Sequence, residues 1–225
     1  MTFSVIGRCE RTGMFGVAIT TSSICVAARC PHARAGVGAV ATQNVTDPSL
    51  GPALLEQLED GKSATEALQS VTADLPFLSY RQLTVIDAQG NTACHTGENI
   101  LGNHSESAGK NCFAAGNLLS STAVPKAITD TFESNADQHL AERLLLSLEA
   151  GLAAGGEEGE VHSAGLLVVD AQSFPLVDLR VDWEENDPIG RLRTIWQAYE
   201  PQMLDYLVRA IDPPSAPSYG VPGDE

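Results

Sequence analysis

The order of strand-like and helix-like segments predicts an α+β fold, a four-layer αββα sandwich in which two mostly antiparallel sheets are flanked by helices. Strand-like segments follow one another across short turns, which is typical of antiparallel hairpins. Helix-like segments come in pairs that are inserted between these hairpins. Because strands and helices do not alternate one by one, we do not expect a doubly wound parallel sheet.

Short runs rich in β-branched and apolar residues mark the expected strands. Residues 2–7 and 15–21 form the first hairpin, joined by a charged turn that ends in a glycine. In the first of these strands Thr2, Ser4 and Ile6 share one face. The other expected strands are 24–28, 37–43, 82–86, 92–95, 111–115, 161–170 and 176–181.

The first helix pair follows the early strands. Residues 48–60 carry leucines at helical spacing, and Gly61 is the expected end of that helix. Ser63 and Glu66 have the spacing of a capping box, which predicts a second helix over 64–75. So short a connection predicts that the two helices lie antiparallel and pack together on a sheet.

The second helix pair is expected at about 121–133 and at 138–153. The latter has a continuous leucine stripe, with Arg143 and Glu149 expected on the solvent side. Hairpin strands at 161–170 and 176–181 follow this pair.

The length and composition indicate a folded protein with one sizeable core. The chain has 225 residues, of which 43% are hydrophobic and 19% charged. We expect a single domain over 1–212, completed by helices at 189–199 and 203–211. Residues 213–225 are rich in Pro, Gly and Ser, which predicts a flexible C-terminal tail.

The charge excludes several classes of partner. The formal net charge is -16, with only three lysines, so the chain lacks the basic surface that nucleic acids and anionic membranes require. We expect a cytoplasmic protein, since the N-terminus has no signal-peptide pattern and no apolar run is long enough for a membrane span. The five cysteines fit no zinc pattern and are expected to be reduced and mostly buried. Scattered histidines and the absence of a glycine-rich phosphate loop predict neither a metal nor a cofactor.

Thr2 is the main candidate for chemistry because of its position. A methionine before a small residue is usually removed, and the mature chain would then begin with a hydroxyl and a free α-amine on one residue. An α-amine has a pKa of about 7.7–8.0 and can serve as the base for its own hydroxyl. Thr2 also begins an expected core strand, which would hold it in place. Many proteins begin with Met-Thr and make no such use of it.

Several stretches carry a resemblance to a known family. They are MTFSVIGRCERTGMFGVAITTSS, ARAGVGAVATQNVTDPSLGP, VIDAQGNTACHTG, AAGNLLSS, LAERLLLSLEAGLAAGG, SAGLLVVD and VDLRVDWEENDP. Together they resemble family of unknown function 1028 (DUF1028), found in bacteria and archaea and related to the N-terminal-nucleophile (Ntn) hydrolases. The resemblance implies the αββα sandwich, with the nucleophile at the start of the first strand, and it implies no substrate.

The Ntn hydrolases use the first residue of the mature chain as nucleophile and base, and Thr2 is the matching position. Proteasome-like members add a lysine that lowers the pKa of the amine, but no lysine of this chain lies in a suitable early strand. Arg29 or Arg34 could supply a fixed positive charge there, although neither could transfer a proton.

Other polar residues near the expected strand ends are candidates for the site. Asn117 is a candidate catalytic residue that would help to bind an oxyanion, or it closes a turn. Ser22 and Ser23 follow the second strand beside Thr2, where they bind substrate or make structural hydrogen bonds. Gln43 ends a buried run, so it lines a pocket or meets solvent.

Charged residues and histidines give weaker signals. Arg34 and His95 are candidate substrate-binding residues, although His95 and His162 also fit histidines that are hydrogen-bonded in a core. Asp178 and Arg180 lie on one strand face and are expected to form structural ion pairs. Cys25 and Cys30 are poor nucleophile candidates.

These observations predict an Ntn-type amidohydrolase that acts on a small amide or acylated metabolite and works as a homodimer without a cofactor. The alternative is a non-catalytic Ntn-fold protein that binds an unknown ligand or has a structural role. Retention of Met1 would favour the alternative, because it blocks the amine.

Overall fold

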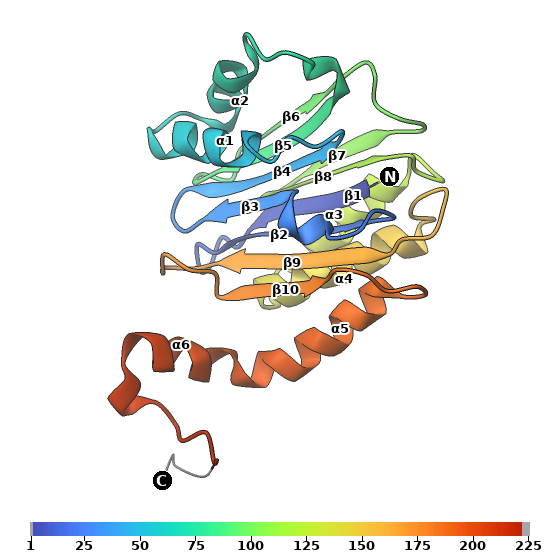
Figure 1. The fold of residues 1–225 in the computed structure, drawn as a ribbon. Helices are drawn as coiled ribbons and strands as arrows, with labels where there is room; N and C mark the ends of the chain where they lie inside the picture. Colours follow the sequence, from blue (N-terminus) through green and yellow to red (C-terminus); the bar gives the residue numbers. More distant parts are fainter. Residues whose placement is uncertain (1, 222–225) are drawn as a thin grey trace.

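The computed structural model of the protein describes residues 2–221 and contains two antiparallel β-sheets with helices packed on them (Figure 1). The six-stranded sheet has the order β10-β9-β2-β1-β8-β7 and the four-stranded sheet the order β3-β4-β5-β6. The strands are β1 (Thr2–Arg8), β2 (Phe15–Thr21), β3 (Pro31–Arg34), β4 (Gly38–Asn44), β5 (Arg81–Asp87), β6 (Thr92–Thr96), β7 (Ser105–Gly109), β8 (Cys112–Asn117), β9 (Ser163–Val169) and β10 (Val177–Val181).

The predicted first hairpin lies in the middle of the six-stranded sheet. β1 pairs with β2 on one side and with β8 on the other, and Thr2 is directly opposite Asn117. Alternate residues of β1 face opposite sides. Phe3 and Val5 are fully buried against the helices, whereas Ile6 packs with residues of the other sheet.

The helices are α1 (Leu50–Glu59), α2 (Ala64–Thr72), α3 (Val124–Ser134), α4 (Leu140–Ala153), α5 (Pro188–Tyr199) and α6 (Met203–Ile211). α1 and α2 pack on the four-stranded sheet, and α3, α4 and α5 pack on the six-stranded sheet. A third apolar cluster, which includes Ile6, Phe15 and Ile86, joins the two sheets. Each of the two predicted helix pairs therefore packs on one of the two sheets.

Local signals in the sequence mark several ends correctly. Ser63 and Glu66 form the predicted capping box at the start of α2. Gly61, two residues before Ser63, has a φ of 88°, which glycine adopts at little cost. Asp178 and Arg180 form the expected ion pair, with Arg180 Nε 2.7 Å from Asp178 Oδ1.

Two sequence predictions, one for residues 24–28 and one for Arg143, are wrong. Residues 24–28 are not a strand: Cys25 adopts left-handed backbone angles and Val26–Ala28 form a short 3-10 helix. Arg143 is not on the solvent side of α4 but buried, because its guanidinium turns inward and donates from Nε to the Phe132 carbonyl oxygen. The edge strands β3 and β7 were not predicted at all.

The C-terminal segment runs away from the sheets after α5 (Figure 1). α5 is fixed to α4 by ion pairs of Arg193 with Glu142 and Glu149. Of the predicted tail, 213–221 is described and includes a short 3-10 helix, Pro213–Ser215, while 222–225 lies outside the described residues. The flexibility of this tail stays a prediction. Within residues 2–221, no helix combines the length and apolarity that crossing a membrane requires.

Candidate functional site

A cavity of about 220 Å³ lies at the N-terminal end of β1. Its walls come from the ends of β1 and β2, the irregular segment between β2 and β3, and the connection from β4 to α1. Thr2, at the start of β1, is 5% exposed and lines this cavity. Its Oγ1 donates a hydrogen bond to Thr21 Oγ1 over 3.2 Å, so the hydroxyl is held by the neighbouring strand. The other lining residues are Thr21, Ser23, Val26, Arg29, Cys30, Asn44, Thr46 and Pro48.

Arg29 is the one charged side chain among the described residues that line this cavity. Its Nη1 donates to the carbonyl oxygens of Ile24 and Cys25 over 2.5 and 3.0 Å. The irregular path of residues 24–28, which the sequence did not predict, therefore positions the arginine. Cys30 lies beside it, and burial raises the pKa of its thiol, which disfavours a thiolate nucleophile there.

A ladder of buried polar side chains connects the two sheets next to Thr2. Ser4 Oγ donates to Gln43 Oε1, and Gln43 Nε2 donates to Gln82 Oε1, both over 2.7 Å. Gln82 Nε2 donates to the Gly116 carbonyl oxygen over 3.3 Å, which fixes the orientation of its amide. All four side chains that form the ladder, including Asn117, are buried and therefore need these partners.

Asn117 ends this ladder and lies opposite Thr2 in the β1–β8 pair. Side chains directly opposite in antiparallel strands have Cβ atoms about 4.5–5.5 Å apart. Asn117 Nδ2 donates to Gln82 Oε1 over 3.2 Å, whereas Oδ1 is buried with no hydrogen-bond partner in residues 2–221. Such an unpaired acceptor is costly, so it marks a place where a donor is expected.

Glu157 is a second buried and unpaired acceptor in this region, and the sequence did not single it out. The residue is 6% exposed, and neither carboxylate oxygen has a hydrogen-bond partner in the part of the chain that the structure describes. Burial raises the pKa of this carboxyl group to about 8. The Ser22 backbone N–H opposes part of that rise, although it does not reach full hydrogen-bond geometry with either oxygen. Ser22 follows Thr21, so the carboxyl group lies near the hydrogen-bond partner of Thr2.

The structure brings together only some of the residues predicted for the site. Thr2 and Ser23 line the cavity, and Asn117 and Gln43 belong to the adjoining ladder. Ser22, another predicted site residue, is half-buried and lies beside Glu157.

Arg34 and His95 lie elsewhere. Arg34 forms an ion pair with Glu59 at the opposite end of β3. His95 Nε2 lies 3.1 Å from the Leu78 carbonyl oxygen, in a separate cavity beside α2. His162 stacks on Trp183 with ring centroids 4.6 Å apart. Each of these histidines thus has a structural partner.

Comparison with known proteins places the chain in a family. The family described as "Family of unknown function (DUF1028)" matches residues 2–192. The chain belongs to DUF1028. The crystal structure of protein SPO2555 from Silicibacter pomeroyi, which has the same family assignment, is 31% identical, covers 88% of either chain and gives a TM-score of 0.81. No match was found among curated proteins.

More distant structures are also similar to this DUF1028 chain. Anbu (ancestral beta-subunit) from Yersinia bercovieri is 14% identical, with a TM-score of 0.40 over 91% of this chain and 97% of that chain. The Anbu (Gly-1) mutant from Hyphomicrobium sp. strain MC1 is also 14% identical, with a TM-score of 0.42 over 91% and 96%. Similarities at this level support no conclusion about activity.

The functional candidates that sequence reasoning missed in this DUF1028 chain are Glu157 and Gln82. Gln82 could have been found, because it is a polar residue at an inward position of an expected strand. Glu157 lies in the glycine- and glutamate-rich stretch 155–160, where nothing in the sequence separates a buried acid from an exposed one. Within residues 2–221 there is no cluster of three or more His, Cys, Asp or Glu side chains that could hold a metal ion.

Proposed function

We propose that this protein is an Ntn-type amidohydrolase with the αββα arrangement of that class, and that Thr2 is its nucleophile once Met1 is removed. The observation that carries the proposal is the position of the Thr2 hydroxyl. It lies at the start of a central buried strand, is held by Thr21 Oγ1, and lines a cavity. A nucleophile on a rigid strand needs little ordering when it reacts.

In the proposed reaction the Thr2 α-amine takes the hydroxyl proton while Oγ1 attacks the substrate carbonyl carbon. The tetrahedral intermediate collapses to an acyl-enzyme as the C–N bond breaks, and the amine product leaves with the proton. Water, activated by the same amine, then hydrolyses the ester. The α-amine accepts and returns the proton in each step, so the reaction needs no histidine.

The unpaired acceptors beside Thr2 fit the α-amine. Asn117 Oδ1 is buried opposite Thr2 and lacks a donor among the described residues, and a free amine supplies donors. The sequence suggested Asn117 for the oxyanion, but its Nδ2 is already engaged by Gln82, so we propose that it orients the amine instead. Glu157, which its raised pKa keeps protonated near neutral pH, would accept a hydrogen bond from the amine through its carbonyl oxygen.

Arg29 narrows the substrate class. A cavity of about 220 Å³ suits a small molecule, and Arg29 at its wall favours a substrate with a carboxylate or another anionic group near the scissile amide. The net charge of -16 does not oppose this, because a local guanidinium dominates at short range. Ser23, at the same wall, is a candidate hydrogen-bonding group for the substrate.

The homodimer is part of the same proposal. The exposed apolar side chains of Leu204 and Ile211 lie on one face of α6 and support a second copy as the partner of this helix. Sedimentation of the full chain at micromolar concentration tests it, and a monomer would contradict it.

Intact mass and acylation of Thr2 test the proposed chemistry without a known substrate. The natively expressed protein should lack Met1. Incubation with p-nitrophenyl acetate should give a one-acetyl adduct on Thr2 that tandem mass spectrometry locates, since the ester acylates the same nucleophile. The Thr2→Ala variant should lose Met1 and fold but form no adduct at residue 2 beyond the slow acetylation of an ordinary α-amine. Thr194→Ala, which removes an exposed threonine hydroxyl on α5 that does not line the cavity, is the matched control and should be acylated like the wild type.

A retained Met1, or wild-type acylation no faster than that of Thr2→Ala, would favour the non-catalytic alternative.

A further inference from the structure

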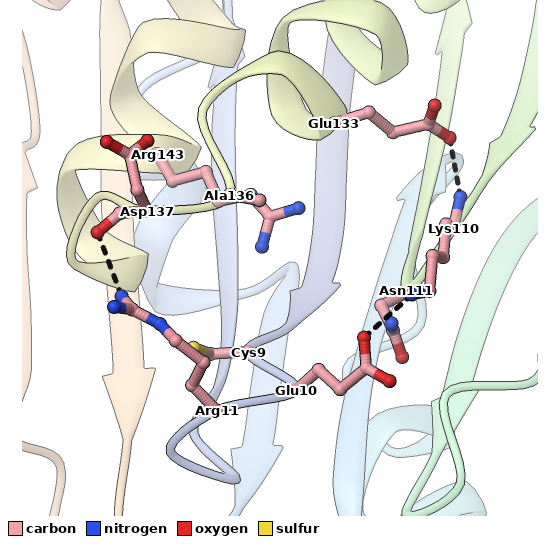
Figure 2. A pocket seen from close by; sticks show the side chains of 9 residues that line it. All are labelled: Cys9, Glu10, Arg11, Lys110, Asn111, Glu133, Ala136, Asp137 and Arg143. Atoms are coloured by element: carbon pink, nitrogen blue, oxygen red, sulfur yellow. Dashed lines mark hydrogen bonds and ion pairs between the residues drawn. The ribbon is translucent and has the colours of Figure 1, made fainter.

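A second cavity, of about 540 Å³, lies at the other end of β1 from Thr2 (Figure 2). Cys9, which directly follows β1, lines it, so the length of β1 separates it from Thr2 by roughly 20 Å. Its walls come from the β1–β2 turn, the β7–β8 turn and the connection from α3 to α4. The lining residues are Cys9, Glu10, Arg11, Lys110, Asn111, Glu133, Ala136, Asp137 and Arg143. It is therefore distinct from the proposed active site.

The guanidinium of Arg143 reaches into the middle of this cavity (Figure 2). The residue is only 6% exposed, and the Phe132 ring centroid lies 3.6 Å from Cζ, so one face is covered. Nε donates to the Phe132 carbonyl oxygen, but neither Nη group has a hydrogen-bond partner within residues 2–221. The Nη edge therefore faces the cavity, where an anion could bind it without breaking a hydrogen bond within the protein.

The acidic side chains of the cavity do not fill this role. Lys110 Nζ forms an ion pair with Glu10 Oε2 over 2.8 Å. Glu133 Oε1 accepts the Lys110 backbone N–H over 2.6 Å. Arg11 Nη2 donates to the Asp137 carbonyl oxygen over 2.8 Å rather than to a carboxylate. Glu10 and Glu133 are thus engaged at the β7–β8 turn. Among residues 2–221, the guanidinium groups of Arg11 and Arg143 have no carboxylate partner.

The balance of charge indicates which anion fits. The lining has three basic and three acidic side chains, namely Arg11, Lys110, Arg143, Glu10, Glu133 and Asp137. Such a neutral set does not attract a polyanion. A singly charged carboxylate matches the two parallel N–H donors of one guanidinium edge.

Cys9 places a thiol at the wall of this cavity, with only 3% of the residue exposed. Burial raises the pKa of its thiol, but hydrogen bonds from Thr12 and Arg11 together outweigh that effect, so the pKa lies below its ordinary value. The sulfur lines the same cavity as Arg143. A ligand bound to the guanidinium would therefore lie beside this thiol.

We propose that this cavity is a binding site for a small carboxylate, held by the Nη edge of Arg143 and lying beside Cys9.

Affinity alkylation of Cys9 in the full-length protein tests this site. Iodoacetate and iodoacetamide both alkylate a thiolate: sulfur attacks the CH2 carbon, the C–I bond breaks and iodide leaves. Only iodoacetate carries a carboxylate. Both reagents react with the same thiolate, so the ratio of their rates at one thiol does not depend on the pKa of that thiol. The reference is the same ratio measured for N-acetylcysteinamide, a small neutral thiol.

We expect the iodoacetate-to-iodoacetamide ratio at Cys9 to exceed the reference about tenfold or more, because a bidentate charged pair holds the reagent. The rate with iodoacetate should saturate, and acetate should protect Cys9 at lower concentration than inorganic phosphate does. Arg143→Lys should lower the ratio. If that variant does not fold, Arg11→Gln replaces the other guanidinium of the cavity at an exposed residue. The iodoacetate-to-iodoacetamide ratio at Cys9 should then stay well above the reference, because Arg143 is still present.

An unchanged ratio at Cys9 would overturn the proposal. So would protection by phosphate that equals protection by acetate, or the absence of Cys9 labelling by either reagent in the folded protein. None of these results depends on Thr2.

Discussion

Replacing Glu157 by glutamine should change how the stability of the protein depends on pH. Burial raises the pKa of this carboxyl group from 4.5 to about 8 in the folded state. The folded state therefore binds the proton more tightly than the unfolded chain does. The stability that this proton contributes is complete below about pH 4.5 and is lost as the pH rises towards 8.

The size of the effect follows from the two pKa values. Between them the free energy of unfolding falls by about 1.4 kcal/mol per pH unit, so the loss from pH 5 to pH 8 is on the order of 3–4 kcal/mol. That is a large part of the 5–15 kcal/mol typical of a folded domain. Glutamine resembles the protonated acid in shape but cannot ionise, so it abolishes this loss.

Urea denaturation at pH 5, 6, 7 and 8 measures the difference between the variant and the wild type. At pH 5 the two proteins should have similar stability, and at pH 8 Glu157→Gln should be more stable by several kcal/mol. Glu158→Gln is the matched control, since Glu158 is an exposed neighbour whose carboxylate accepts from Asn103 Nδ2 over 3.2 Å. It should follow the wild type at every pH. A difference between Glu157→Gln and the wild type that stays constant from pH 5 to pH 8 would refute the reasoning.

Three further predictions concern stability. Phe3→Ala and Val5→Ala remove fully buried side chains and should each cost about 2–5 kcal/mol in chemical denaturation, whereas Val45→Ala, at a side chain that is 47% exposed, should cost little. Asp87→Ala removes a buried carboxylate that accepts backbone N–H groups of the β5–β6 turn and of the start of α2, so it should cost about 2–4 kcal/mol; a loss below 0.5 kcal/mol would mean that water replaces the carboxylate. Deletion of 213–225 should leave the melting temperature nearly unchanged, and a drop of many degrees would show that this segment is docked.

The elements that the sequence predicted correctly are those with local signals. The periodic leucines of α4 and the capping box of α2 need no knowledge of distant residues. The two strands that were missed, Pro31–Arg34 and Ser105–Gly109, are edge strands. Edge strands carry polar and small residues and even proline, so they lack the apolar pattern of a central strand.

The parts of the site that could not be predicted depend on pairing between distant segments. The register between β1 and β8 places Asn117 opposite Thr2, and no local pattern fixes such a register. Residues 24–28 have the β-branched and small residues of a strand, but Cys25 adopts left-handed backbone angles, which a strand does not allow. The chain therefore turns there, and Arg29 lies at the cavity. Arg143 faces inward because its guanidinium contacts the ring and the carbonyl oxygen of Phe132, which the helical pattern does not show.

Amide hydrolysis by wild-type and Thr2→Ala protein, each confirmed by intact mass to lack Met1, tests the central claim most directly. Release of p-nitroaniline from a panel of small acyl p-nitroanilides, including ones with an acyl-chain carboxylate for Arg29, would be measured near pH 8. We predict that the wild type turns over at least one member, that Thr2→Ala loses activity by about 10³-fold or more, and that Thr2→Ser keeps part of it. Equal turnover by wild type and Thr2→Ala, or full activity in a protein that retains Met1, would contradict the account.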